Sequence, residues 1–436
     1  MQMGDLPMRV LWLCNIMLPM IAEKLGFESS VKEGWITGLL ERFIADGGTK
    51  NVQLAIAFPA NEMLESYHDV FVWNGVQVQF YGFYEDLNTP EVYKPALESR
   101  FEGIVNDFKP DIVHIFGTEY PHALAMAKVV KDPKTLLVGM QGVISLCAEE
   151  YQALLPEHVV HHHTFRDLLK GDGIVDQQHK FELRGKNEVH TLQMVGNVTG
   201  RTDFDKSFCE KINPNAEYYA MNETMRPCFY EGKWSLDNYK PHRIFFSQAD
   251  YPLKGFHFLL KAMPAILKKY PDAEIVVAGN NIIRNGVMGI IKRPSYGKYL
   301  LHLSGKYGLR NRIRFLGRLS AEEMKQEYLK CHTYVCASVL ENSPNSVGEA
   351  MLLGTPVVCA NVGGVPSMIT DGLEGLLFEK GSKEGLAEAI LKIWADDGLA
   401  QKLGRNARIR AKRTHDGERN FNRLIEIYQA IEGKKE

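Results

Sequence analysis

The 436-residue sequence has few cysteines and no long apolar run. Its seven cysteines form no CxxC pair, which disfavours both a zinc site and a disulfide framework. The longest apolar stretches, such as the one from Thr135 to Ala148, are interrupted and shorter than the ~20 residues that a membrane helix requires. No signal-peptide pattern opens the sequence. We therefore expect a cytoplasmic protein with reduced cysteines that contacts the inner membrane at most peripherally.

Missing motifs exclude several classes of enzyme. The sequence contains no Walker A motif, no GxGxxG after its first expected strand and no HExxH, which disfavours nucleoside triphosphatases, dehydrogenases and zinc proteases. The formal net charge of −2 provides no general basic field for nucleic acid. The run from His161 to His163 does not suit a metal ion, because adjacent residues of a helix diverge by ~100°. We expect neither a bound metal nor a cofactor.

The composition, 45% hydrophobic and 24% charged, is that of a globular protein long enough for two domains. Runs of Val, Ile and Leu alternate with amphipathic segments, which predicts parallel sheets in an α/β fold of two Rossmann-like, doubly wound domains with a cleft between them. We place a first domain at 1–226, a linker at 227–240, a second domain at 241–417 and a helix, 418–436, that packs back on the first domain. The expected strands are 9–14, 52–58, 76–81, 111–116, 136–141 and 191–195, then 243–247, 274–278, 313–316, 333–337 and 356–360.

The segment 337–356 carries the strongest chemical signal, because it runs from a strand through a polar loop into a helix. A helix start of this kind offers free amides and the positive end of the helix dipole to a phosphate. Ser346 and Glu349 match a capping box, which by itself would account for Glu349 but not for Glu341 at the end of the strand. Carboxylates accept hydrogen bonds from vicinal diols, so the two glutamates favour a nucleotide-sugar.

A second block follows the first strand of the second domain, where Lys254 and Gly255 open a helix. The ammonium group of Lys254 would neutralise a diphosphate. Gln248, six residues earlier, can donate a hydrogen bond but carries no charge.

Together these segments resemble the family-four retaining glycosyltransferases, through Glu341, Glu349, Gly354-Thr-Pro-Val-Val and Gly363-Gly-Val-Pro. The resemblance implies the GT-B fold, with Glu349 on the nucleotide ribose, Glu341 on the donor hexose, and the donor held by backbone amides near Asn345, Ser346 and Val347. The family carries an arginine on the leaving diphosphate where this sequence has Gln248. We expect another cation, for example Arg318 or Arg201, to replace it.

In the first domain, the resemblance implies that Gly34 approaches the donor diphosphate. His114 lies inside a strand pattern and is interpreted as a core histidine, whereas Glu119 and His122 on the following loop are candidates for contact with the acceptor or the donor hexose. Arg201 is a candidate partner of an anionic acceptor. Asp203 and Asp205 form the DxD pattern of metal-dependent transferases, but that pattern belongs to a different architecture, and here it is interpreted as helix capping.

We therefore expect a metal-independent enzyme that moves a hexose from a nucleoside-diphosphate sugar to an acceptor hydroxyl with retention of configuration. The middle of the chain also resembles transferases of bacterial surface and capsular polysaccharides, which implies a glycan or lipid-linked acceptor. Two alternatives stay open: a nucleotide-sugar 2-epimerase of the same architecture, and a non-enzymatic sugar-nucleotide-binding partner. The catalytic candidates are Lys254, Glu341, Glu119 and His122.

Overall fold

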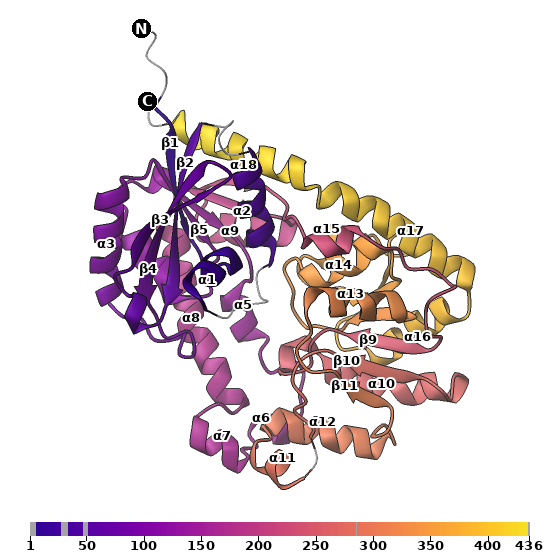
Figure 1. Cartoon of the computed structure of the whole chain (residues 1–436). Coiled ribbons are helices and arrows are strands. Elements are labelled where there is room, and N and C mark those ends of the chain that lie inside the picture. The colour runs from indigo at the N-terminus through magenta and orange to yellow at the C-terminus, as the bar shows by residue number, and fades with distance from the viewer. Residues whose placement is uncertain (1–5, 28–33, 47–50, 285, 435–436) are drawn as a thin grey trace. The chain divides into compact units, whose positions relative to one another are not determined.

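The computed structural model describes residues 6–27, 34–46, 51–284 and 286–434 (Figure 1). The chain divides into two compact units. The first unit contains Met1–Ser145, Lys180–Arg226 and His415–Glu436, and the second contains Leu146–His179 and Pro227–Thr414.

In the described residues, eight strands form the sheet of the first unit in the order β3-β4-β2-β1-β5-β6-β7-β8. All neighbours are parallel except β3 and β4. Every residue of β1 except the half-buried Arg9 is buried, as expected for a parallel sheet covered on both faces. The strands are β1 (Met8–Leu13), β2 (Val52–Ala60), β3 (His68–Trp73), β4 (Val76–Tyr84), β5 (Ile112–Phe116), β6 (Leu136–Gly139), β7 (Asn197–Gly200) and β8 (Glu217–Ala220).

Helices connect these strands, as parallel pairing requires. They are α1 (Pro19–Leu25), α2 (Gly34–Asp46), α3 (Ala96–Phe108), α4 (Pro121–Val129), α8 (Ile174–Met194), α9 (Asp203–Ile212) and α18 (Gly417–Glu432). The first six residues of α8 and most of the short helix α5 (Ile144–Glu149) belong to the second unit.

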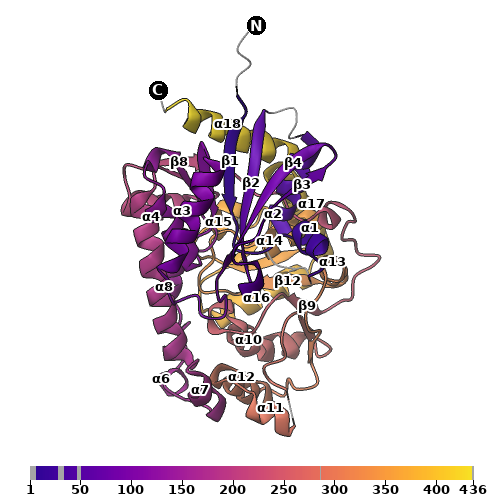
Figure 2. The ribbon, with the colours of Figure 1, turned by 60° about the vertical axis from the view of Figure 1, so that its left-hand side comes forward.

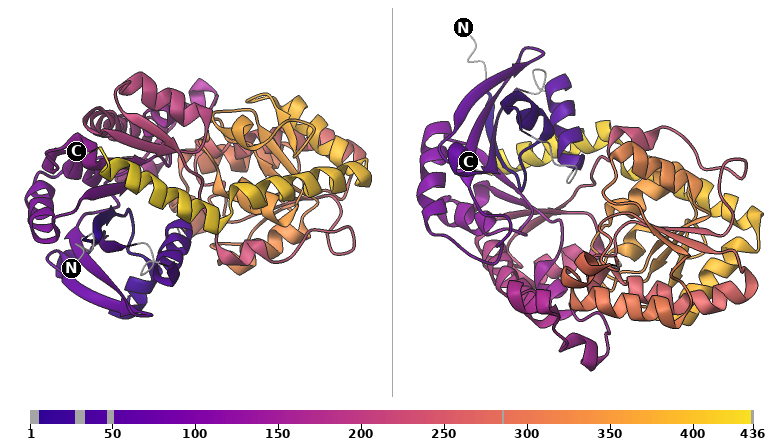
Figure 3. Two further views of the ribbon diagram at one scale, coloured as in Figure 1. Left: turned by 90° about the horizontal axis from the view of Figure 1, so that it is seen from above. Right: turned by 60° about the horizontal axis from the view of Figure 1, so that its bottom comes forward.

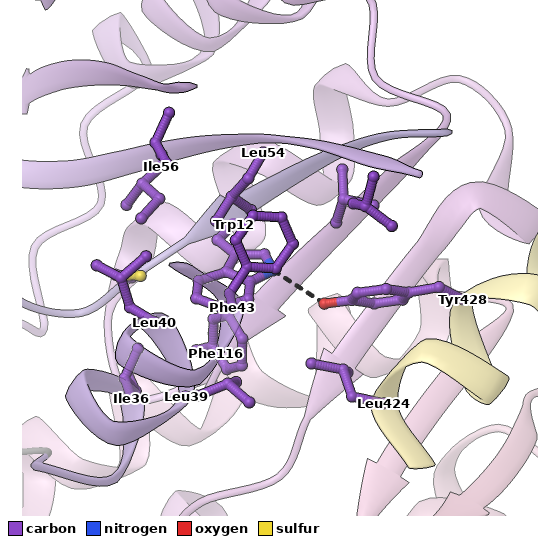
Figure 4. Close-up of a cluster of buried hydrophobic side chains, with 14 of the residues drawn as sticks. Trp12, Ile36, Leu39, Leu40, Phe43, Leu54, Ile56, Phe116, Leu424 and Tyr428 are labelled. Atoms are coloured by element: carbon purple, nitrogen blue, oxygen red, sulfur yellow. Dashed lines mark hydrogen bonds between the residues drawn. The ribbon is translucent and has the colours of Figure 1, made fainter. Parts of the chain in front are cut away.

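The last helix, α18, completes the core of the first unit (Figure 4). The indole N–H of Trp12 on β1 donates to the hydroxyl of Tyr428 on α18 over 2.9 Å. Trp12 also packs edge-on against Phe116, and Phe43 of α2 packs edge-on against Phe421 of α18. Because these side chains are almost fully buried, the C-terminal helix is an integral layer of this unit.

The second unit is a six-stranded parallel sheet within the described residues, in the order β11-β10-β9-β12-β13-β14. Counted from its first strand this is the order 3-2-1-4-5-6 of a dinucleotide-binding sheet, whose ligand crevice lies where the order reverses. The strands are β9 (Arg243–Phe246), β10 (Glu274–Val277), β11 (Ile313–Phe315), β12 (Thr333–Cys336), β13 (Val357–Ala360) and β14 (Leu376–Phe378).

Helices cover both faces of this second sheet (Figures 2 and 3). The fully buried β9, β12 and β13 agree with that arrangement. The helices are α6 (Glu157–Val160), α7 (Phe165–Lys170), α10 (Phe256–Lys269), α11 (Val287–Ile291), α12 (Ser295–Lys306), α13 (Ala321–Lys330), α14 (Asn345–Leu353), α15 (Val365–Met368), α16 (Lys383–Trp394) and α17 (Asp397–Thr414).

One segment belongs to a different unit from the one expected. Residues 146–179 pack with the second unit, although the sequence pattern placed them in the first domain. Glu150 forms an ion pair with Lys380 at 2.8 Å, and His257 hydrogen-bonds to the carbonyl oxygen of Ala153 at 3.0 Å. These contacts join positions more than 100 residues apart, so local sequence patterns carry no sign of them.

The secondary structure differs from the expected pattern in a few places. Residues 191–194 of the expected strand are instead the last turn of α8, Val195 follows the helix, and the strand begins at Asn197. Thr191 favours a strand as a β-branched residue, but its place in the helix overrides that preference. Three strands were not predicted: β3, which pairs antiparallel with β4, and the short strands β8 and β14.

The expected linker, 227–240, is folded into the second unit. Its Trp234 is buried, its backbone N–H donates to the carbonyl of Leu353, and its indole N–H donates to the carbonyl of Cys331. Within the described residues, none of the helices has the length and apolar character needed to span a membrane.

Candidate functional site

Two loops meet where the strand order of the second sheet reverses. β9 and β12 are neighbours there, and the loops after them are joined by a hydrogen bond from the N–H of Val339 to the carbonyl of Leu253 at 2.9 Å. Gly255 has a φ of +69°, and a Cβ at this position would lie only 1.9 Å from the carbonyl oxygen of Ala337. Glycine is therefore required, because any other residue would separate the loops.

This contact brings Lys254 and Glu341 together. Lys254 Nζ lies 2.5 Å from Glu341 Oε1, and the Ser338 hydroxyl donates to the same oxygen over 2.7 Å. Burial is the largest single influence and lowers the pKa of Lys254, but the charge of Glu341, its hydrogen bond and the neighbouring Tyr251 together outweigh burial and hold the pKa well above its ordinary value. The lysine keeps its positive charge at neutral pH, at an edge where a ligand phosphate would approach.

The helix that follows Glu341 presents its amides at the same sheet edge. α14 begins at Asn345, after Pro344 as the N-cap, and no side chain caps it. Asn345 Oδ1 is buried without a hydrogen-bond partner in the described part of the chain. The N–H of Val347 donates to the carbonyl of Pro344 at 2.9 Å, so Val347, expected among the donor-binding amides, already has a partner. The first amides, of Asn345 and Ser346, are the ones placed for an anion.

The structure overturns the capping-box interpretation of Glu349. Ser346 lies inside α14 and is not its N-cap, because the helix starts two residues earlier than the sequence pattern suggested. Glu349 Oε2 instead accepts a long hydrogen bond, 3.4 Å, from the hydroxyl of Tyr328.

A glycine turn after β13 fixes the backbone of Glu341. Gly363 has a φ of +50°, and a Cβ there would lie 2.1 Å from the carbonyl oxygen of Glu341. The N–H of Gly364 donates to that same oxygen over 3.0 Å. The Gly-Gly pair recognised in the sequence thus positions the glutamate from the neighbouring strand.

Polar groups also follow β10 and β11 on this edge. Asn280 donates to Asp250 Oδ2 over 2.9 Å, and Gly279, with a φ of +92°, leaves room for the same carboxylate. Burial raises the pKa of Asp250, and the hydrogen bond from Asn280 and, more weakly, the charge of the exposed Arg318 act against that rise. Gln248, on the loop between β9 and Asp250, is half-buried.

In the first unit, polar residues gather where its own strand order reverses, between β1 and β5. Asn15, after β1, donates to Glu119 Oε2 over 3.1 Å, and Glu119 Oε1 accepts from the N–H of Gly142 over 2.8 Å. Sequence reasoning found Glu119 but missed Asn15 and Glu85. Their shared signal is that each directly follows a buried strand, which places it at the ligand edge of a parallel sheet.

His122 lies behind this cluster and offers no surface to a ligand. Its ring is fully buried, with Nδ1 2.5 Å from Glu85 Oε2 and Nε2 2.9 Å from Asn15 Oδ1. The expectation of direct substrate contact is therefore wrong for this arrangement, because both ring nitrogens are occupied. His122 positions Asn15, which in turn holds Glu119.

His114 is a core residue, as expected. It is fully buried, its Nδ1 lies 2.8 Å from the hydroxyl of Tyr428, and burial lowers its pKa to about 3.

The remaining first-domain candidates occupy structural positions. Arg201 forms a buried ion pair with Glu223 at 2.5 Å, which neutralises its charge. It also lines a cavity of about 750 Å³. Thr202 and Asp205 form the capping box of α9, which explains the apparent DxD pattern. Gly34 is the first residue of α2, whereas the preceding Glu33 lies outside the described residues.

Comparison with known proteins fits this geometry. Residues 233–410 match the family model described as Glycosyl transferases group 1. D-inositol 3-phosphate glycosyltransferase of Corynebacterium urealyticum is 29% identical over 180 residues, 41% of this chain and 41% of that protein. The matched regions span less than half the length of the first curated relatives.

Solved structures extend the likeness to nearly the whole chain. Sucrose-phosphate synthase from Thermosynechococcus elongatus has a TM-score of 0.69 at 14% identity and covers 97% of this chain and 99% of its own. Anabaena HepE in complex with UDP-glucose has a TM-score of 0.63 at 16% identity, with coverage of 97% and 100%. The prediction of a GT-B fold with two Rossmann-like domains is thereby confirmed.

Proposed function

We propose that this protein is a retaining glycosyltransferase that moves a hexose from a nucleoside-diphosphate sugar to a hydroxyl of a glycan or lipid-linked acceptor. The observation that carries the proposal is the Lys254–Glu341 pair beside the uncapped start of α14. At this sheet edge the cation suits a diphosphate and the carboxylate suits a sugar diol. The free helix amides suit a phosphate oxygen.

In this proposal each group has a separate task. Lys254 and the amides of Asn345 and Ser346 stabilise the negative charge that builds on the diphosphate as it leaves. Glu341 binds the hydroxyls of the donor hexose and Glu349 those of the nucleotide ribose. Because these groups supply the required positive charge, the reaction needs neither a metal ion nor a cofactor.

The acceptor belongs to the first unit in this proposal. Glu119, held by Asn15 and the N–H of Gly142, has a fixed carboxylate that can accept a hydrogen bond from an acceptor hydroxyl. The resemblance to surface-polysaccharide transferases supports a growing or lipid-linked glycan as the acceptor, in the cytoplasm at the inner membrane face.

Gln248 motivates the alternatives. A neutral side chain where relatives carry arginine weakens phosphate stabilisation, which suits a non-enzymatic sugar-nucleotide-binding partner. A nucleotide-sugar 2-epimerase shares the architecture.

A thermal-shift screen against UDP-, GDP-, ADP- and dTDP-sugars tests the donor. A specific donor raises Tm by mass action, and the complex should then transfer the sugar to a membrane or glycan fraction with retained anomeric configuration. An epimerised nucleotide-sugar formed from the donor alone would refute transfer. A different outcome is that the chain binds the donor but transfers sugar to none of the acceptor fractions. That result, with an unchanged cellular glycan in the Glu341→Ala strain, would favour a non-enzymatic sugar-nucleotide-binding partner.

A further inference from the structure

The short helix α7 exposes its apolar side chains and buries the carboxylate of Asp167. Phe165, Leu168 and Leu169 are 69%, 69% and 71% exposed, whereas Asp167 between them is fully buried. A surface helix ordinarily shows the opposite pattern. The inversion leaves an apolar face that water solvates poorly.

Specific contacts hold α7 in this orientation. Asp167 Oδ2 accepts from the N–H of Ser295 over 2.9 Å, and the Thr164 hydroxyl donates to the carbonyl of Arg293 over 2.9 Å. Thr164 and Asp167 also form the capping box of the helix. The apolar face is therefore turned outward by a fixed polar framework, and it does not result from a loose segment.

The neighbouring helix α11 extends the apolar surface. It lies beside α7 at one end of the second unit (Figures 1 and 2), and its Ile290 and Ile291 are 65% and 48% exposed. We call the set the apolar tip, made of Phe165, Leu168, Leu169, Ile290 and Ile291.

Cations follow or precede the apolar residues in the chain. Lys170, Arg284 and Lys292 are exposed on or beside the two helices. The nearby carboxylates are engaged locally: Asp172 with Arg166 at 2.7 Å, and Asp176 with the N–H of Gly173 at 3.0 Å. The surface thus combines exposed apolar groups with a positive rim.

We propose that the apolar tip docks on the anionic surface of a lipid bilayer. Aromatic and leucine side chains enter the boundary between headgroups and acyl chains, while lysine and arginine at the rim meet anionic headgroups. A symmetric dimer through the same surface fits less well, because it would place the cationic rim of one copy against that of the other. The inference bears on the proposed function, since a lipid-linked acceptor is met at a membrane, but it rests on the exposed residues alone.

Co-sedimentation of the full chain with vesicles tests this. We expect binding to vesicles of phosphatidylcholine mixed with phosphatidylglycerol, weaker binding to phosphatidylcholine alone, and loss of binding at high salt. The double variants Leu168→Ser/Leu169→Ser and Lys170→Glu/Lys292→Glu should each reduce vesicle binding at least tenfold. Because these side chains are exposed, Tm should stay unchanged.

Met63→Ser is the matched control, since Met63 is an equally exposed apolar residue, 81%, of the first unit. It should bind vesicles like the unchanged chain. Vesicle binding that survives both double variants overturns the proposal. An absence of vesicle binding by the unchanged chain also overturns it. If the chain then self-associates and Leu168→Ser/Leu169→Ser abolishes this, the surface binds a second copy instead. Donor binding is measured separately by thermal shift, so failure of membrane docking and failure of the proposed transferase function can be told apart.

Discussion

Lys254 Nζ and Glu341 Oε1 lie 2.5 Å apart, although 87 positions separate the two residues in the chain. They meet because β9 and β12 are neighbours in the sheet, and because Gly255 lets the two loops touch. Each residue restrains the other, so in the proposed function both would be held in place before the donor arrives, which lowers the cost of binding.

Removing the lysine tests its role in catalysis. Lys254→Ala should lower kcat by about 10²- to 10³-fold, since it removes a preorganised cation from the departing diphosphate. Initial rates at saturating donor measure this. Lys268→Ala, an exposed lysine in the last turn of α10, is the control and should retain full activity. Comparable rates for the two variants would remove Lys254 from the reaction.

Two glycine variants distinguish the effect of a steric clash from that of backbone strain. Gly363→Ala should weaken donor binding at least tenfold, because its Cβ would lie 2.1 Å from the carbonyl oxygen of Glu341. Gly372→Ala is the matched control: it has a φ of +74° but nothing within 4 Å. The control should cost about 1–3 kcal/mol of stability from strain alone and leave donor affinity unchanged. Equal donor affinities in the two variants would contradict this account.

Substitutions in the cluster around Glu119 should affect use of the acceptor and not binding of the donor. Glu119→Ala should raise the acceptor KM or lower kcat by at least tenfold while the donor-induced rise in Tm persists. His122→Phe should have a smaller effect, because His122 acts through Asn15. Glu102→Ala on α3, an exposed carboxylate, should change neither. A lost donor response in Glu119→Ala would show that the cluster has another role.

Adding the positive charge that the family resemblance leads one to expect at this position tests Gln248. Gln248→Arg should raise kcat, by up to about tenfold, if phosphate stabilisation limits the rate, whereas Gln248→Glu should lower it. An unchanged rate in both variants would mean that Gln248 does not face the diphosphate. The double variant Gln248→Arg/Arg318→Ala then shows whether Arg318 already supplies the charge.

Buried histidines predict acid sensitivity. Burial lowers the pKa of His257 from 6.5 to about 3, so the folded protein stays neutral there while the unfolded chain takes up a proton. The free energy of unfolding therefore falls as pH decreases from about 6.5 toward 3, by up to about 1.4 kcal/mol per pH unit for this group. His257→Gln should lower Tm at neutral pH but reduce its loss on acidification.

Scanning calorimetry between about pH 7 and pH 5 measures that difference. His161→Gln, an exposed histidine, serves as the comparison and should leave the acid dependence of Tm unchanged. If His257→Gln loses as much Tm on acidification as the unchanged chain, a different group drives the acid sensitivity.

The sequence by itself determined the α/β class, ten of the strands and the residue types of the donor motif. Buried strands are continuous apolar runs, and Glu341, Glu349 and Lys254 follow or flank them at recognisable spacings. The same local patterns were misleading at 191–194, which are helical, and at Ser346, which lies inside α14 and not at its N-cap.

Only the tertiary structure decided which groups meet. It paired Lys254 with Glu341, buried His122 behind Asn15, and assigned residues 146–179 to the second unit. It also turned the apolar face of α7 outward. Each of these outcomes depends on contacts between distant segments, whose energies are set by burial and geometry and leave no trace in local sequence.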